Sequence, residues 1–138
     1  ALFDISKVTG VELHKDAWLL VKTKKLFCTN PRTNLVHEIG AFEIFIPLFD
    51  HTANIHWKNQ TRQVHTPHGA MNAPHVNGAG LACLGSVKEV VPTLLRKRQF
   101  AAAVELAITF IESVNVGDTW GQHIVSWPIA ATTQRGAT

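Results

Sequence analysis

The stretch that organises this sequence is His65-Thr-Pro-His-Gly-Ala-Met-Asn-Ala-Pro-His-Val-Asn-Gly-Ala-Gly-Leu-Ala-Cys-Leu-Gly85. It holds three of the eight histidines, two of the six prolines, four of the nine glycines and one of the two cysteines. Proline lacks a backbone N–H and glycine loses much conformational entropy on folding, so this composition disfavours a helix or a central strand. We therefore expect an irregular loop, and the apolar residues 81–84 indicate that it closes onto a packed interior.

A helix start follows this loop. Ser86 and Glu89 have the spacing of a capping box, in which Ser86 is the N-cap and Glu89 reaches back to it. The beginning of such a helix offers free N–H groups and the positive end of the helix dipole, which favour the thiolate form of a nearby cysteine. Cys83 is therefore a candidate nucleophile, while a buried, inert cysteine at the end of a strand remains the alternative.

The active-site segment of ubiquitin-conjugating (E2) enzymes resembles the run Ala73-Pro-His-Val-Asn-Gly-Ala-Gly-Leu-Ala-Cys-Leu-Gly85, roughly a tenth of the chain. In register and without a gap, the family's proline, aliphatic residue, glycine, catalytic cysteine and following leucine match Pro74, Val76, Gly80, Cys83 and Leu84. Ala73 replaces the family's histidine, and His75 replaces its asparagine. This variant resembles bacterial E2-like proteins encoded beside ubiquitin-like, E1-like and deubiquitinase-like partners, including operons linked to antiphage defence.

The resemblance implies transthiolation. Cys83 would accept the C-terminus of a ubiquitin-like protein from an E1-like enzyme as a thioester, and would pass it to an amine on a protein target. His75 is the expected oxyanion donor or acid–base group beside this catalytic cysteine. The expected substrate-binding residues are Asn72, Asn77, Gly80 and Leu84, and the two asparagine amides are alternatives to His75. No phosphate-binding glycine motif is present, so we expect no cofactor, and activation of the modifier would fall to another protein.

Zinc binding is the main competing chemistry. His65, His68, His75 and Cys83 offer nitrogen and sulfur ligands of the kind that Zn²⁺ binds tetrahedrally. A bound zinc would make Cys83 a ligand instead of a nucleophile. We favour a site without metal, in which His65 and His68 brace the loop and compensate for Ala73. The main non-enzyme alternative is a catalytically inactive interaction module that resembles E2 variants.

Length and composition limit the remaining possibilities. A chain of 138 residues fits one domain, which we assign to residues 1–128, with 129–138 as a frayed tail. The formal net charge of +3 is too small to indicate nucleic-acid binding. No apolar run approaches the ~20 residues of a membrane span, and no signal peptide is visible. Two cysteines in unlike contexts do not form a disulfide framework. We therefore expect a cytoplasmic protein with no membrane or nucleic-acid partner.

The pattern along the chain predicts the fold. β-branched and aromatic residues predict strands within 11–28, 35–46 and 55–57, with a turn at 29–34. Helical patterns occupy 86–116, where Pro92 interrupts the first helix and the second has an apolar face of Phe100, Val104, Ile108 and Ile111. The predicted fold class is α+β and UBC/E2-like: an antiparallel β-meander, an irregular active-site loop and C-terminal helices.

Three further residues have expected positions. Cys28 follows an apolar pair with no helix start behind it, so we place it in the core or at a strand end. Trp120 and Trp127 are expected to pack back onto the domain, because large aromatic side chains gain most from burial.

Overall fold

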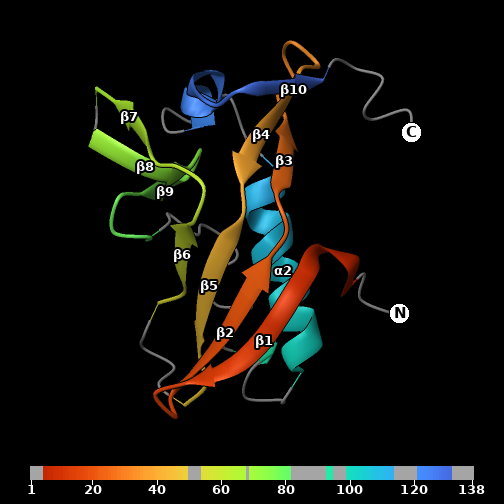
Figure 1. Ribbon diagram of the computed structural model, residues 1–138, viewed down its shortest axis with the longest axis vertical. Helices are drawn as coiled ribbons and strands as arrows, with labels where there is room; N and C mark the ends of the chain where they lie inside the picture. The colour runs from red at the N-terminus through yellow and green to blue at the C-terminus, as the bar shows by residue number, and fades with distance from the viewer. Residues whose placement is uncertain are drawn as a thin grey trace.

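The structure is a computed structural model that describes residues 5–49, 54–67, 69–81, 93–94, 99–113 and 121–131. Antiparallel strands in three sheets are its main elements, and helix α2 (Phe100–Glu112) lies behind the largest sheet in Figure 1. Two 3-10 helices, η1 (Ile5–Lys7) and η3 (Gly121–Ser126), are also present. None of the described helices is long and apolar enough to cross a membrane.

The largest sheet has the strand order β1-β2-β5-β6, with every neighbouring pair antiparallel. Its strands are β1 (Val8–His14), β2 (Trp18–Thr23), β5 (Phe42–Pro47) and β6 (His56–Asn59). Side chains alternate between the two faces of a strand. The ladder therefore places Val11, Val21, Ile44 and Trp57 in one row on the inner face, toward α2.

A second sheet continues the middle strands of the first. Strand β3 (Leu26–Thr29) follows β2 after a short interruption, and β4 (Val36–Gly40) comes shortly before β5. The pairs β2–β3 and β4–β5 therefore act as two long strands of one hairpin that bend from the first sheet into the second. Gly40 allows this bend with a φ of +105°, a conformation that residues with a side chain rarely adopt. At the turn 30–35, the Asn30 side chain accepts a hydrogen bond from the Arg32 N–H at 2.9 Å.

Strand β10 (Ile129–Ala131) pairs with β4 at the end of the described chain. The frayed tail that the sequence predicts therefore cannot begin at residue 129. Residues 132–138 lie outside the described part of the structure. Next to this strand, Trp127 is 2% exposed, which confirms the prediction that it packs onto the domain, whereas Trp120 is not among the described residues.

The third sheet lies within the proline- and glycine-rich stretch. It has the order β7-β8-β9, with β7 (Val64–Thr66), β8 (Gly69–Ala73) and β9 (Val76–Asn77). The prediction of an irregular loop is therefore wrong for much of 65–77. The two prolines fall between these strands, where no ladder N–H is needed, so short pairing is compatible with the composition.

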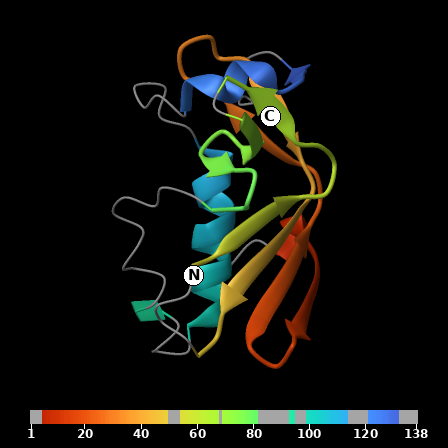
Figure 2. The same cartoon turned by 90° about the vertical axis from the view of Figure 1, so that its left-hand side faces the viewer.

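The core lies between the large sheet and α2, which stacks along one face of the sheet in Figure 2. Trp57 is 1% exposed, and its indole N–H donates to the Ala107 carbonyl at 3.1 Å. The Trp57 ring also packs against Phe110, with ring centres 5.3 Å apart. The buried residues of α2 are Ala103, Val104, Ala107, Ile108 and Ile111.

The UBC/E2-like α+β fold class that the sequence predicts is wrong. The described chain is mainly antiparallel β-sheet, and α2 is the one α-helix described along its length, whereas the predicted class has several helices after the active-site loop. The second predicted helix is confirmed as α2, although Phe100 on its predicted apolar face is 39% exposed. Within the first predicted helix, only 93–94 are described and they are helical.

Candidate functional site

The segment before Cys83 is held to the large sheet by two asparagines. The Asn72 side-chain oxygen accepts a hydrogen bond from the Asn59 backbone N–H at 2.9 Å. In return, the Asn59 side-chain amide donates to the Asn72 carbonyl at 2.9 Å and also to the Ile39 carbonyl. Asn72 is 1% exposed, so these bonds form where an unpaired polar group would be costly. The pair connects β6 and β8 and fixes the third sheet against the first.

Asn77 organises the turn that follows. Its side-chain oxygen accepts hydrogen bonds from the backbone N–H groups of Ala79 and Leu81, both at 3.0 Å. Its own N–H donates to the Leu81 carbonyl at 2.9 Å, and its carbonyl accepts from the Gly80 N–H at 3.0 Å. Asn77 therefore closes a compact turn whose last residue, Leu81, stands two positions before Cys83 in the sequence.

Gly80 connects this turn to the large sheet. Its carbonyl accepts the Trp57 backbone N–H at 2.9 Å, and its φ is +88°. A Cβ atom at this position would lie 3.1 Å from the Trp57 carbonyl oxygen and 3.2 Å from the Lys58 side chain. Glycine is thus required here both by the backbone conformation and by the close approach of β6.

His75 lies between β8 and β9, at the side of the third sheet that faces α2. Its ring is half-buried and tilted against the Phe110 ring, with the two ring centres 6.1 Å apart. The preceding Pro74 and the following Val76 are buried, which restricts the backbone on both sides. The structure therefore brings His75, Asn72, Asn77 and Gly80 together in one short, well-anchored segment.

Three predicted features fall outside the described residues: Cys83, Leu84 and the Ser86–Glu89 capping box. His68, one of the four candidate zinc ligands, also lies outside them, whereas His65 is exposed on β7. Among the residues that the structure does describe, no cluster of three or more histidine, cysteine, aspartate or glutamate side chains is arranged to hold a metal ion.

The other cysteine is chemically protected. Cys28 is a core residue of β3, 1% exposed, as its sequence position predicts. Burial, together with the smaller effect of the negative charge of Glu112, raises the pKa of the Cys28 thiol to about 12. At neutral pH this thiol is protonated and shielded from solvent, which makes it a poor nucleophile.

Sequence reasoning missed the contribution of β6. Asn59 is a hub that, besides its bonds to Asn72, accepts the N–H groups of Thr61 and Arg62 at 2.9 and 3.0 Å. The composition of the run Asn59-Gln-Thr61 indicates a turn, and this was the only sequence feature that pointed to the hydrogen bonds of the Asn59 side chain. Its partners come from β8 and β4, which a local pattern does not reveal.

We compared the chain with protein-family models, with curated proteins and with solved structures, and nothing matched in any of the three comparisons.

Proposed function

We propose that this protein is a cytoplasmic acyl carrier of ubiquitin-like conjugation, which holds the C-terminus of a ubiquitin-like modifier as a thioester on Cys83. The observation that carries this proposal is the anchored segment 72–81. Its turn is closed by Asn77 and tied to β6 through Gly80, so the chain is fixed up to Leu81. Acyl transfer requires a nucleophile held in a defined position, and an anchored approach segment meets part of this requirement.

The proposed reaction has two balanced steps. The Cys83 thiolate attacks the thioester carbonyl carbon of the modifier carried by an E1-like enzyme, and the enzyme's thiolate leaves. An amine of the target then attacks the new thioester and loses a proton to solvent, an amide bond forms, and the Cys83 thiolate is released. His75 would stabilise the oxyanion of each tetrahedral intermediate by donating a ring N–H.

The asparagines have a different role in this proposal from the one that the sequence suggests. The Asn72 side chain is buried and donates to the Asn77 carbonyl at 2.8 Å, while the Asn77 side-chain oxygen accepts two backbone N–H groups. We assign both residues to holding the segment, which leaves His75 as the candidate oxyanion donor.

The test uses a ubiquitin thioester of mercaptoethanesulfonate, which supplies an activated acyl group without an E1-like enzyme. Mixed with this reagent, the protein should form a ubiquitin adduct that is seen on a non-reducing gel and removed by dithiothreitol. Cys83→Ala should abolish the adduct, and Cys28→Ala is the matched control that should retain it. An adduct that survives in Cys83→Ala, or no adduct with the parent protein, contradicts the proposal.

A further inference from the structure

The outer face of the large sheet, opposite α2, carries four ring side chains close together. In the ladder, Trp18 on β2 lies opposite His14 on β1, and Phe45 on β5 lies opposite His56 on β6. The rings also contact one another across an intervening strand. His14 meets Phe45 with ring centres 5.3 Å apart at 72°, and Trp18 meets His56 at 5.8 Å and 74°.

These edge-to-face contacts hold the rings but do not cover them. In an edge-to-face pair, the edge of one ring meets one face of the other. All four side chains are half-buried. The rings are thus fixed by one another on a face of the sheet that is not part of the core.

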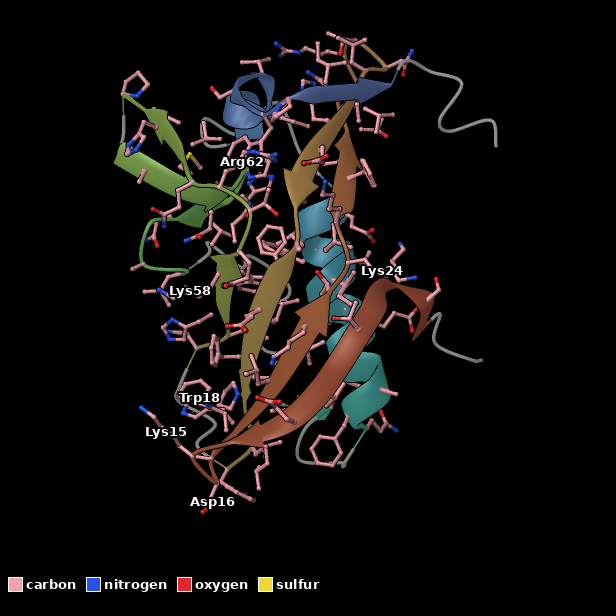
Figure 3. All side chains as sticks on the ribbon, viewed as in Figure 1. Lys15, Asp16, Trp18, Lys24, Lys58 and Arg62 are labelled. Carbon is pink, nitrogen blue, oxygen red and sulfur yellow. The ribbon has the colours of Figure 1, made fainter. Side chains whose placement is uncertain are left out.

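A hollow of about 230 Å³ opens among these rings, with two lysines at its rim. Its lining is His14, Lys15, Trp18, Phe45, His56 and Lys58. Pockets for drug-sized ligands usually begin at roughly 300 Å³, so this one has room for one planar ring system, and an attached group can extend to the lysines at its rim. Figure 3 shows Trp18, Lys15 and Lys58 along the same side of the molecule, with Asp16 at the tip of the β1–β2 turn.

The two lysines at the rim keep their positive charge available. Among the described residues, neither Lys15 nor Lys58 forms a salt bridge, although Asp16 follows Lys15 in the turn and Glu43 lies opposite Lys58 in the ladder. Lys58 donates to the Ala79 carbonyl at 2.9 Å, a contact with a neutral group that orients the ammonium without cancelling its charge. A ligand here would therefore meet two cations.

The turn that presents Lys15 is strained. Lys15 and Asp16 have φ values of +53° and +57°, and the Ala17 N–H donates to the His14 carbonyl at 3.1 Å. Tight hairpin turns of this geometry prefer Asn-Gly at the two central positions, because left-handed backbone is costly for other residues. Strained backbone of this kind is concentrated at functional sites. Lys15 and Asp16 are therefore less favourable for the backbone of this turn than Asn-Gly would be, and we attribute their presence to their side chains.

We propose that this hollow binds a planar anion: an aromatic or heteroaromatic ring that carries a phosphate or a carboxylate. The ring stacks against Trp18 and Phe45, and the anionic group lies between Lys15 and Lys58. The imidazoles of His14 and His56 add N–H donors at the sides. Stacking supplies contact area, and the two ammonium groups supply the preference for an anion.

The experiment titrates the full chain with AMP, which has a ring and a phosphate, and with benzoate, which has a ring and a carboxylate. Tryptophan fluorescence reports binding, because Trp18 is half-exposed whereas Trp57 and Trp127 are buried. Trp18→Phe keeps a stacking ring and removes that signal, so it identifies the source of the change. Adenosine, without the phosphate, and ribose 5-phosphate, without the ring, should each bind at least about tenfold more weakly than AMP.

The variants test the assignment of charge. Lys15→Met combined with Lys58→Met should weaken AMP or benzoate binding at least about tenfold and leave adenosine unaffected. Lys15→Met alone removes one charge without changing the Lys58–Ala79 contact. The matched control, Lys22→Met with Lys24→Met, removes the same charge from lysines that do not line the hollow and should leave the affinity unchanged.

Saturable binding of either probe that responds only to the lysines of the hollow supports the proposal, and the tighter probe identifies the anion as phosphate or carboxylate. No saturable binding of either probe overturns it. Binding that is equally weakened by the control pair also overturns it, because the attraction would then come from net charge alone.

Discussion

The Gly80 carbonyl accepts the backbone N–H of Trp57 at 2.9 Å, and this bond joins the segment before Cys83 to the edge strand of the large sheet. The same Trp57 donates its indole N–H to the Ala107 carbonyl of α2. One residue therefore links the anchored segment, the sheet and the helix. The proposed carrier function depends on this link, because it fixes the position of the segment that precedes Cys83.

Replacing Gly80 by alanine should destabilise the protein by about 2–3 kcal/mol, since the new Cβ meets the Trp57 carbonyl in a backbone conformation that already disfavours a side chain. Gly69→Ala is the matched control: Gly69 also has a positive φ of +105°, but nothing lies within 4 Å of a Cβ built there. It should cost about 1 kcal/mol. Urea denaturation measures both, and equal losses would show that the contact with β6 is unimportant.

Asn72→Ala should lower the free energy of unfolding by about 2–4 kcal/mol, because it removes the buried amide that accepts from the Asn59 N–H on β6 and donates to the Asn77 carbonyl on β9. Asn72→Asp keeps an oxygen for the Asn59 N–H but loses the donor to Asn77. Chemical denaturation of both variants should therefore show a clear loss for each. A neutral Asn72→Ala variant would mean that the pairing is not what holds the third sheet.

Asp16→Gly should stabilise the protein by about 1 kcal/mol, because glycine adopts a positive φ without steric cost. Thermal and urea unfolding would both detect the gain. The side chain of Lys15 is retained in this variant, so binding of a planar anion should persist. A destabilised Asp16→Gly protein would indicate that the Asp16 side chain contributes more to the turn than the backbone strain costs.

Cys28 should give a pH-dependent contribution to stability at alkaline pH. The pKa of its thiol rises from 9.0 to about 12 in the folded protein, so above pH 9 the unfolded chain loses this proton while the folded chain keeps it. The unfolded state then binds fewer protons, and stability falls as pH rises, by up to about 1.4 kcal/mol per pH unit. Below pH 9 the contribution is fully present.

Denaturation of the parent protein and of Cys28→Ala between pH 8 and 11 isolates this effect, because lysines titrate in both and the chain has no tyrosine. The parent should lose stability more steeply with pH than the variant. Parallel curves would refute protection of the thiol by burial. Iodoacetamide labelling of the native protein at pH 8 should likewise leave Cys28 unmodified.

His75→Ala should slow the discharge of a Cys83 thioester to free lysine by about tenfold to a hundredfold, the range of a single acid–base or oxyanion group. Its effect on the free energy of unfolding should be smaller than that of Phe110→Leu, which removes a ring that packs against both His75 and Trp57. If His75→Ala loses stability and discharge rate in proportion, the histidine is structural.

Much of the local structure was predictable from sequence. The strands within 18–28 and 35–46, the turn at 29–34 and the buried face of 100–112 all follow from residue patterns that repeat with the period of a strand or a helix. The burial of Cys28 and Trp127 was predictable for the same reason, because apolar neighbours along the chain indicate where a side chain must find a core.

The fold class was not predictable in this way. A motif of five matched positions led to an E2-like arrangement, but strand order depends on pairing between residues far apart in sequence. The bend at Gly40, where β4 passes into β5 of another sheet, depends on backbone freedom at that residue. Likewise, the pairing of 129–131 with β4 has no local sequence signature.

By itself, the sequence determined which segments extend, where the helix α2 runs and which residues could take part in chemistry. Only the tertiary structure decided that Asn72 and Asn77 hold the backbone, and that His14, Trp18, Phe45 and His56 share one face. The physical reason is that periodicity and turn chemistry act over a few neighbouring residues. Hydrogen-bond partners and shared faces arise only once distant strands are brought into register.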